Sequence, residues 1–178
     1  MFKKSFKNLK TTRVLCSSAI LAALFVVLYA LKLPLTPELR ITFTFIPLAI
    51  AGWLFGPVPA MLVGLVGDVT GALLFPSGAY FPGFTLTSLL SGLIFGVFLY
   101  EKKDKNILIW TILSKLFINM LLNTALNALW LSIITSKGYI VFLLQHFIKN
   151  ITALPIEIVI LFIVFKILST HRIRKMYK

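Results

Sequence analysis

The sequence contains few of the residues from which most metal and catalytic sites are built. Its 178 residues include 1 cysteine, 2 histidines and 5 acidic residues. A single cysteine, Cys16, excludes an internal disulfide and a cysteine-based metal cluster. His146 has only one other histidine to pair with, His171, which falls in a basic C-terminal tail. We therefore expect no metal and no cofactor.

Several catalytic motifs are also missing. The chain has no G-x-x-x-x-G-K-[ST], so it cannot hydrolyse ATP through a P-loop of its own. It has no H-E-x-x-H and no G-x-S-x-G. An enzyme is therefore disfavoured, although an acid pair built across helices from Asp68 and Glu157 stays open. We also find no inverted repeat of the kind that many secondary transporters carry.

What the sequence has in abundance is apolar residues and cations. Hydrophobic residues make up 59% of the chain and the mean hydropathy is +0.98, which is typical of an integral membrane protein. Thirteen of the 18 cations lie in three islands, at residues 3–13, 102–105 and 166–178. These islands flank apolar runs, so we interpret the +13 charge as a topology signal that also suits anionic lipid headgroups, with no nucleic acid as partner.

The positive-inside rule places all three islands in the cytoplasm, so each stretch between them must cross the bilayer an even number of times. Gly56 and Pro57 interrupt the apolar residues between 41 and 75 and divide them into two short spans. We predict one all-α membrane domain, residues 1–178, with both termini cytoplasmic. Its six transmembrane helices are expected at residues 14–31, 42–56, 58–75, 83–100, 107–133 and 139–168. The second is the weakest prediction because it is short for a bilayer core of about 30 Å.

Polar residues at membrane depth are costly, so they indicate where function lies. Asn119, Asn123 and Asn127 recur every fourth residue, and at about 100° per residue they share an arc of about 80° with Trp130. Two interpretations stay open, helix–helix adhesion and contact with a ligand.

Other intramembrane polar groups allow the same choice. Asp68 is either a ligand acceptor, a proton carrier or a structural acid paired with a lysine, and it lies beside a stripe of small residues that permits close approach of a helix or a flat ligand. Lys149, on a polar face of the last span, either meets a ligand carboxylate, pairs with Glu157 or reaches the outer interface. Ala19 and Ala23 form a small-xxx-small pair for close helix contact, within the protein or with a partner.

Three sequence segments resemble one known family. They are Ala19-x-x-x-Ala23 in the first span, GDVTGALLFPSGAYFPGFTLTSLLSGLIFG at residues 67–96 and NTALNALWL at residues 123–131. Together they resemble the substrate-binding S component of an energy-coupling factor (ECF) vitamin transporter. Within that family the chain is most similar to the folate-specific members.

The resemblance implies a protein of the bacterial cell membrane that captures folate from outside. It further implies docking through Ala19 and Ala23 on a transmembrane coupling protein, the T component, which works with two cytoplasmic ATPases. Chemistry gives the remaining roles as hypotheses: Asp68 and Asn123 read a pterin, aromatic residues stack on it, and cations bind the glutamate tail. Asn127 lies on the same helix face as Asn123 and is predicted to contact the ligand. The predicted stacking residues are Tyr80, Phe81 and Trp130, and the predicted tail residues are Arg40 and Lys149.

Alternatives from other classes are kept. An S component for another vitamin or precursor, such as hydroxymethylpyrimidine, pantothenate or a queuosine-like base, would share the fold and the docking motif. A solitary proton-coupled carrier would depend on Asp68 or Glu157 and transport without an ATPase. An intramembrane enzyme would turn over a substrate and lose its activity when a single acid is replaced.

Overall fold

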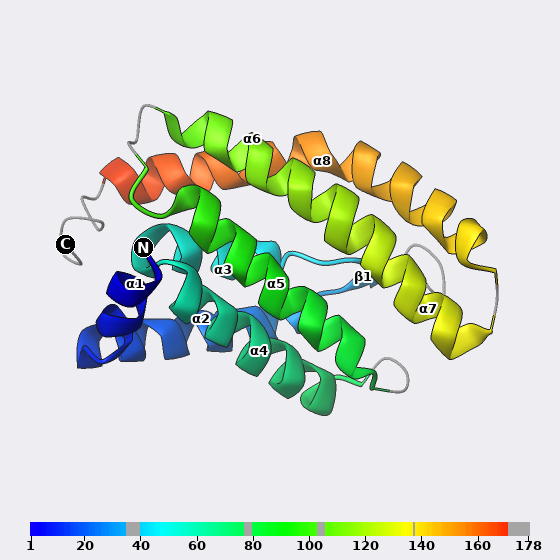
Figure 1. The fold of residues 1–178 in the computed structure, drawn as a ribbon, viewed down its shortest axis with the longest axis horizontal. Helices are drawn as coiled ribbons and strands as arrows, with labels where there is room; N and C mark the ends of the chain where they lie inside the picture. The colour runs from blue at the N-terminus through cyan, green and yellow to red at the C-terminus, as the bar shows by residue number, and fades with distance from the viewer. Residues whose placement is uncertain (35–39, 77–79, 103–105, 137, 171–178) are drawn as a thin grey trace.

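The structure, a computed structural model, describes residues 1–34, 40–76, 80–102, 106–136 and 138–170. Helices account for nearly all of its secondary structure, together with one pair of very short strands (Figure 1). In chain order the elements are α1 (Phe2–Leu9), α2 (Thr12–Ala30), β1 (Leu33–Pro34), β2 (Arg40–Ile41), α3 (Phe45–Phe55), α4 (Pro57–Leu74), α5 (Pro82–Leu99), α6 (Ile107–Phe117), η2 (Ile118–Leu126), α7 (Asn127–Thr135) and α8 (Tyr139–Thr170).

In the described part of the chain, five helical segments are long and apolar enough to cross a membrane: Thr12–Ala30, Pro57–Leu74, Pro82–Leu99, Ile107–Thr135 and Tyr139–Ser169. The chain is thus a multi-pass, all-helical membrane protein. The predicted second span at residues 42–56 coincides with α3, an apolar helix of 11 residues. At 1.5 Å per residue, α3 is about 16 Å long, roughly half of a bilayer core.

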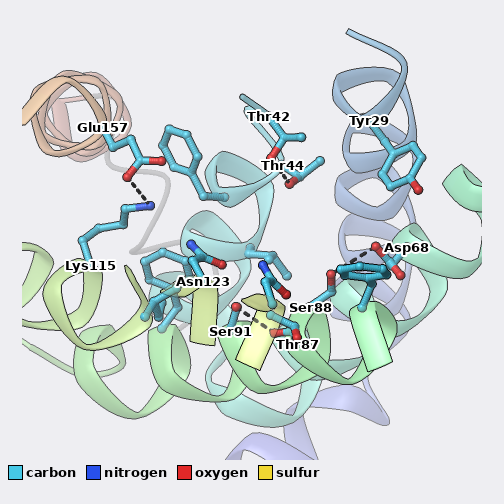
Figure 2. A pocket seen from close by; sticks show the side chains of 16 residues that line it. Tyr29, Thr42, Thr44, Asp68, Thr87, Ser88, Ser91, Lys115, Asn123 and Glu157 are labelled. Atoms are coloured by element: carbon cyan, nitrogen blue, oxygen red, sulfur yellow. Dashed lines mark hydrogen bonds and ion pairs between the residues drawn. The ribbon is translucent and has the colours of Figure 1, made fainter. Parts of the chain in front are cut away.

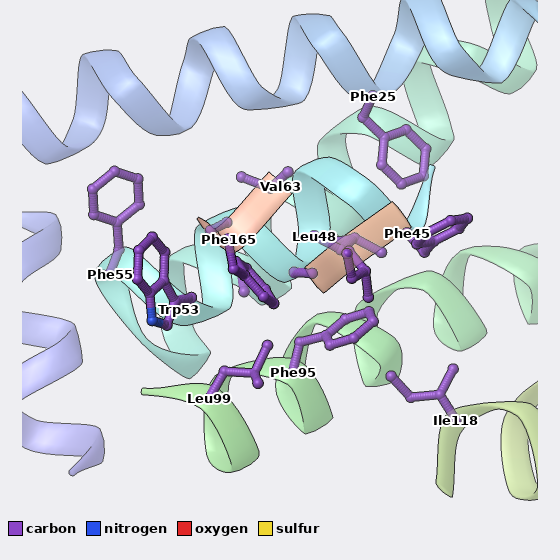
Figure 3. Close-up of a cluster of buried hydrophobic side chains, with 14 of the residues drawn as sticks. Phe25, Phe45, Leu48, Trp53, Phe55, Val63, Phe95, Leu99, Ile118 and Phe165 are labelled. Carbon is purple, nitrogen blue, oxygen red and sulfur yellow. The ribbon is translucent and has the colours of Figure 1, made fainter. Parts of the chain in front are cut away.

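Helix α3 lies in the middle of the bundle and supplies much of its core. Trp53 and Phe55 are 1% exposed, and the Trp53 ring lies 5.2 Å from the ring of Phe165 in α8. Figure 3 shows Trp53 near Phe165 at one end of the buried cluster, and Phe45 near Phe25 of α2 at the other end. The short helix is therefore enclosed by the longer ones.

The junction between α3 and α4 is a sharp break that the sequence signals correctly. Gly56 has a φ of +95°, a conformation that a side chain disfavours, and Pro57 begins α4 at a position where no amide donor is needed. Ser5 from α1 fills the break: its hydroxyl donates to the Phe55 carbonyl at 3.1 Å and accepts from the Val58 amide at 3.1 Å.

The stripe of small residues on α4 (Ala60, Gly64, Gly67 and Gly71) serves close helix packing. A Cβ atom added at Gly67 would lie 2.7 Å from the Phe25 ring of α2. On the neighbouring α5, a Cβ added at Gly92 would lie 2.3 Å from the carbonyl oxygen of Ala60. Of the two uses predicted for this stripe, the described contacts therefore support the approach of helices.

The N-terminus, the last turn of α5, the first turn of α6 and the last turn of α8 all lie at one end of the bundle (Figure 1). Asn8 of α1 donates to the Tyr100 hydroxyl at 2.9 Å, and Lys4 forms an ion pair with Glu101. The hydrogen bond from Lys4 to the Glu101 carboxylate raises the pKa of the lysine above its usual value. The first cationic island thus lies beside Lys102 of the second, whose Nζ lies 3.8 Å from the centre of the Trp110 ring.

Candidate binding cavity

A cavity of about 180 Å³ opens between the helices, with contributions from all the long segments and from α3 (Figure 2). Its polar lining consists of Thr42, Thr44, Asp68, Thr87, Ser88, Ser91, Lys115, Asn123, Asn127 and Glu157. Its apolar lining consists of Tyr29, Phe45, Leu48, Phe84, Phe95 and Ile118. Flat aromatic surfaces thus alternate with hydrogen-bonding groups, the usual composition of a pocket for an organic ligand.

Asp68 of α4 stands at one end of the cavity and is held by hydroxyl groups of α5. Its Oδ2 accepts from Thr85 Oγ1 at 2.7 Å and its Oδ1 accepts from Ser88 Oγ at 3.1 Å. Thr85 Oγ1 also lies 2.9 Å from the Tyr80 hydroxyl. Because Thr85 has one proton, which goes to the carboxylate, Tyr80 must be the donor in the second bond. Asp68 is 6% exposed, and this chain of hydroxyls fixes its orientation.

The other end of the cavity carries an ion pair (Figure 2). Lys115 Nζ lies 2.9 Å from Glu157 Oε2, and the lysine side chain is 1% exposed. Asn119 Nδ2 donates to the same carboxylate oxygen at 2.8 Å, while the ammonium lies 4.2 Å from the centre of the Phe45 ring. Desolvation of both charges is costly, so each must be compensated by its partner. The ion pair thus joins α6 to α8.

The three asparagines lie on one continuous rod that is not a regular α-helix. Between α6 and α7 the chain forms the nine-residue π-helix η2, and the Asn127 amide donates to the Leu122 carbonyl five residues earlier. The π geometry changes the angle per residue on which the predicted common face depended. Asn119 is fully buried and bonded to Glu157, whereas Asn123 and Asn127 line the cavity.

Asn123 and Asn127 differ in their hydrogen bonding. Asn123 Nδ2 donates to Asn119 Oδ1 at 2.9 Å. Asn127 Oδ1 is buried and has no hydrogen-bond partner among the described residues. A buried amide oxygen without a donor is costly, so the Asn127 side chain is suited to accept from a ligand N–H group.

The polar face predicted on the last span, which comprises Gln145, His146, Lys149, Asn150 and Glu157, divides in the structure. Asn150 is buried and bonds to η2 through Thr124 Oγ1 at 2.8 Å, and His146 is 5% exposed. Gln145 is exposed, and Lys149, which is half-buried, does not line the cavity. Only Glu157 of this face reaches the lining.

Three of the predicted binding residues, Asp68, Asn123 and Asn127, are therefore brought together in the cavity. The aromatic residues predicted to stack are not among the residues that line the cavity. Trp130 Nε1 donates to Thr87 Oγ1 of the lining at 3.1 Å, and the Phe81 ring lies 5.6 Å from that of Trp130. Tyr80 is half-exposed and bonds to Thr85. The backbone of Arg40 lies in β2, and its side chain lies outside the described residues.

The sequence interpretation missed most of the wall. Tyr29, Phe45, Phe84 and Phe95 supply its aromatic surfaces. The hydroxyls of α5 recur at Thr87, Ser88 and Ser91 without a charge to mark them. Their shared helix face was a readable signal, because residues three and four apart lie on the same side of a helix.

Comparison with known proteins identifies the family. Residues 13–170 match the family model described as ECF transporter, substrate-specific component. The chain is 41% identical over 129 residues to the folate transporter FolT of Clostridium novyi (strain NT), covering 71% of this chain and 73% of the relative. It is 30% identical over 152 residues to the folate transporter FolT of Leuconostoc mesenteroides subsp. mesenteroides, covering 83% and 81% respectively.

A solved structure agrees with these matches. The crystal structure of FolT bound with folic acid superposes with a TM-score of 0.80 at 34% sequence identity, covering 88% of this chain and 94% of that one. The resemblance read from the sequence is confirmed, as is the expectation of a transport protein and not an enzyme. The chain belongs to the substrate-specific components of ECF transporters.

Proposed function

We propose that the protein is a folate-binding S component and that the pterin ring of folate occupies the cavity. The observation that carries the proposal is the placement of an oriented carboxylate, Asp68, and an unpartnered amide oxygen, Asn127, in one cavity with aromatic walls. A pterin is flat and presents several N–H donors, which suits this set of groups. The similarity to a FolT bound with folic acid supports the same ligand.

The size of the cavity indicates which part of folate it can enclose. At about 180 Å³ it is smaller than the pockets of about 300–1,000 Å³ that enclose drug-sized ligands. We expect the cavity to hold the ring system and the glutamate tail to extend toward the end of the bundle opposite the termini. Strand β2 lies beside the cavity, since Thr42 directly follows it in the lining, so Arg40 stays our predicted partner of the tail and Lys149 the second.

The direct test is purification of the chain alone in detergent. After denaturation, the absorption spectrum of the released material should contain a pterin chromophore, and added folate should quench tryptophan fluorescence saturably. Absence of both signals would overturn folate as the substrate and call for a screen of other vitamins. Replacing Arg40 by Gln should weaken the binding of folate more than the binding of a bare pterin. Equal losses of affinity for the two ligands would contradict the assignment of Arg40 to the tail.

The finer topology is also part of the proposal. We infer six crossings in a bacterial cell membrane, with α3 and the β1–β2 ladder together forming the second, and with both termini in the cytoplasm. The ion pair between Lys4 and Glu101 brings the first two cationic islands together, and the end of α8 lies at the same end of the bundle (Figure 1). This supports the orientation, because cations mark the cytoplasmic side.

Transport would then require partners. Ala19 and Ala23 are exposed on α2, on the side away from buried Ser18 and Phe25, and this surface is our proposed docking site for the T component. Two ATPases on other chains would supply the energy. Replacing both alanines by leucine should abolish uptake in cells but leave folate binding intact, because the added bulk prevents close helix approach. Full uptake by that variant would contradict the docking assignment.

A further inference from the structure

Helix α1 lies outside the membrane-spanning helices and is firmly attached to their ends. Ser5 is fully buried in the break between α3 and α4, where it bonds on both sides. Asn8 bonds to Tyr100, and Lys4 pairs with Glu101. Because these contacts come from one side of α1, they also determine which side faces outward.

The outward side combines apolar and cationic residues. Phe2 and Phe6 are 50% and 56% exposed, and Lys3, Lys7 and Lys10 are exposed beside them. At about 100° per residue, Phe2, Phe6 and Leu9 fall within an arc of about 60°, and the three lysines fall within an adjacent arc of about 60°. The helix itself, FKKSFKNL, contains no acidic residue.

We propose that α1 is an interfacial helix that binds the anionic surface of the bilayer. The phenylalanines enter the boundary between headgroups and acyl chains, and the lysines remain at the level of the phosphates. Two arguments support this occupant. An eight-residue helix at the end of the spans is held at the depth of the headgroups, and a basic amphipathic helix complements a negatively charged surface. The proposal does not depend on the identity of the transported substrate.

The test uses the full chain reconstituted in vesicles, with Cys16 replaced by Ser and a spin label attached at one new cysteine. Label at Phe6→Cys reports the apolar stripe, and label at the neighbouring Lys7→Cys is the matched control on the cationic arc. In phosphatidylcholine vesicles containing one quarter phosphatidylglycerol, the label at 6 should be accessible to oxygen and protected from a water-soluble nickel chelate. The label at 7 should be more accessible to the chelate.

The dependence of this protection on lipid charge tests whether α1 binds an anionic surface. Protection at position 6 should decrease in pure phosphatidylcholine, and the combined replacement of Lys3, Lys7 and Lys10 by Gln should cause the same decrease in the anionic vesicles. Water-like accessibility at position 6 in both membranes would overturn the proposal, as would equal protection in both. Protection that arises only on addition of the coupling complex would assign this surface to a protein partner. Unchanged thermal unfolding confirms that each variant folds, and Phe2→Cys replaces Phe6→Cys where it does not.

Discussion

The replacement of Asp68 by Asn gives the sharpest test of the proposed cavity. In the structure both carboxylate oxygens already accept one hydroxyl, from Thr85 at 2.7 Å and from Ser88 at 3.1 Å, and their remaining lone pairs are available for a ligand. Asparagine keeps one acceptor oxygen and loses the charge. A hydrogen bond to a charged group contributes about 1.5–3 kcal/mol, so folate affinity should decrease by about 10- to 150-fold.

A second variant distinguishes the effect of the Asp68 charge on affinity from the effect of the carboxylate's orientation. Thr85→Val keeps the side-chain shape and removes the hydroxyl that joins Tyr80 to the Asp68 carboxylate. It removes a bond that orients the acceptor but none made to the ligand, so the loss should be smaller, about 0.5–1.5 kcal/mol or roughly two- to tenfold. Tyr80→Phe should change affinity by less still.

The assay is tryptophan quenching by folate in detergent, with thermal unfolding of the ligand-free protein as the control for folding. The expected order of loss is Asp68→Asn, then Thr85→Val, then Tyr80→Phe. Affinity of Asp68→Asn within threefold of the parent, with an unchanged melting temperature, would refute Asp68 as a ligand acceptor. A larger loss for Thr85→Val than for Asp68→Asn would show that the hydroxyl itself is the contact.

Three further replacements test other parts of the structure. Lys115→Met should destabilise the ligand-free protein by about 2–4 kcal/mol, because the Glu157 carboxylate loses its ion pair and keeps the Asn119 amide and its electrostatic interaction with Lys149. Adding Glu157→Gln should recover most of that loss in thermal unfolding. A double variant as unstable as the single one would contradict a compensating pair. Asn127→Leu should weaken folate binding and leave the melting temperature of the ligand-free protein unchanged, since the amide oxygen has no partner within the described residues. Gly92→Leu should prevent folding or cost more than about 3 kcal/mol in a melt, because even a Cβ would lie 2.3 Å from a backbone oxygen of α4.

The sequence predicts the helices better than the site because the two depend on different signals. Apolar runs and the Gly56–Pro57 break determine where α3 ends and α4 begins, and both are local in the chain. The cavity wall depends on where aromatic rings from three separate helices meet, which no local sequence pattern contains. Tyr29 and Phe84 therefore could not be assigned to the wall from composition or spacing.

The asparagine series illustrates the limit most clearly, because its interpretation assumed a regular helix. In η2, Thr124 Oγ1 donates to the Asn119 carbonyl at 2.7 Å, and Asn150 Nδ2 approaches the same oxygen at 3.4 Å. Within a membrane every backbone carbonyl needs a donor, and a π segment rearranges those partners. Asn150, which lies in α8, thus stabilises η2 through these hydrogen bonds.

These contacts divide the intramembrane polar residues into two kinds. Asn119 and Asn150 join helices, the role that isolated asparagines usually have in membranes. Asn127 and Asp68 keep acceptor capacity that faces the cavity. Helix–helix adhesion is therefore observed for Asn119 and Asn150, and contact with a ligand stays our prediction for Asn127 and Asp68. The π-helix is what separates them, because it keeps Asn119 in the helix contact with Glu157 while Asn123 and Asn127 line the cavity.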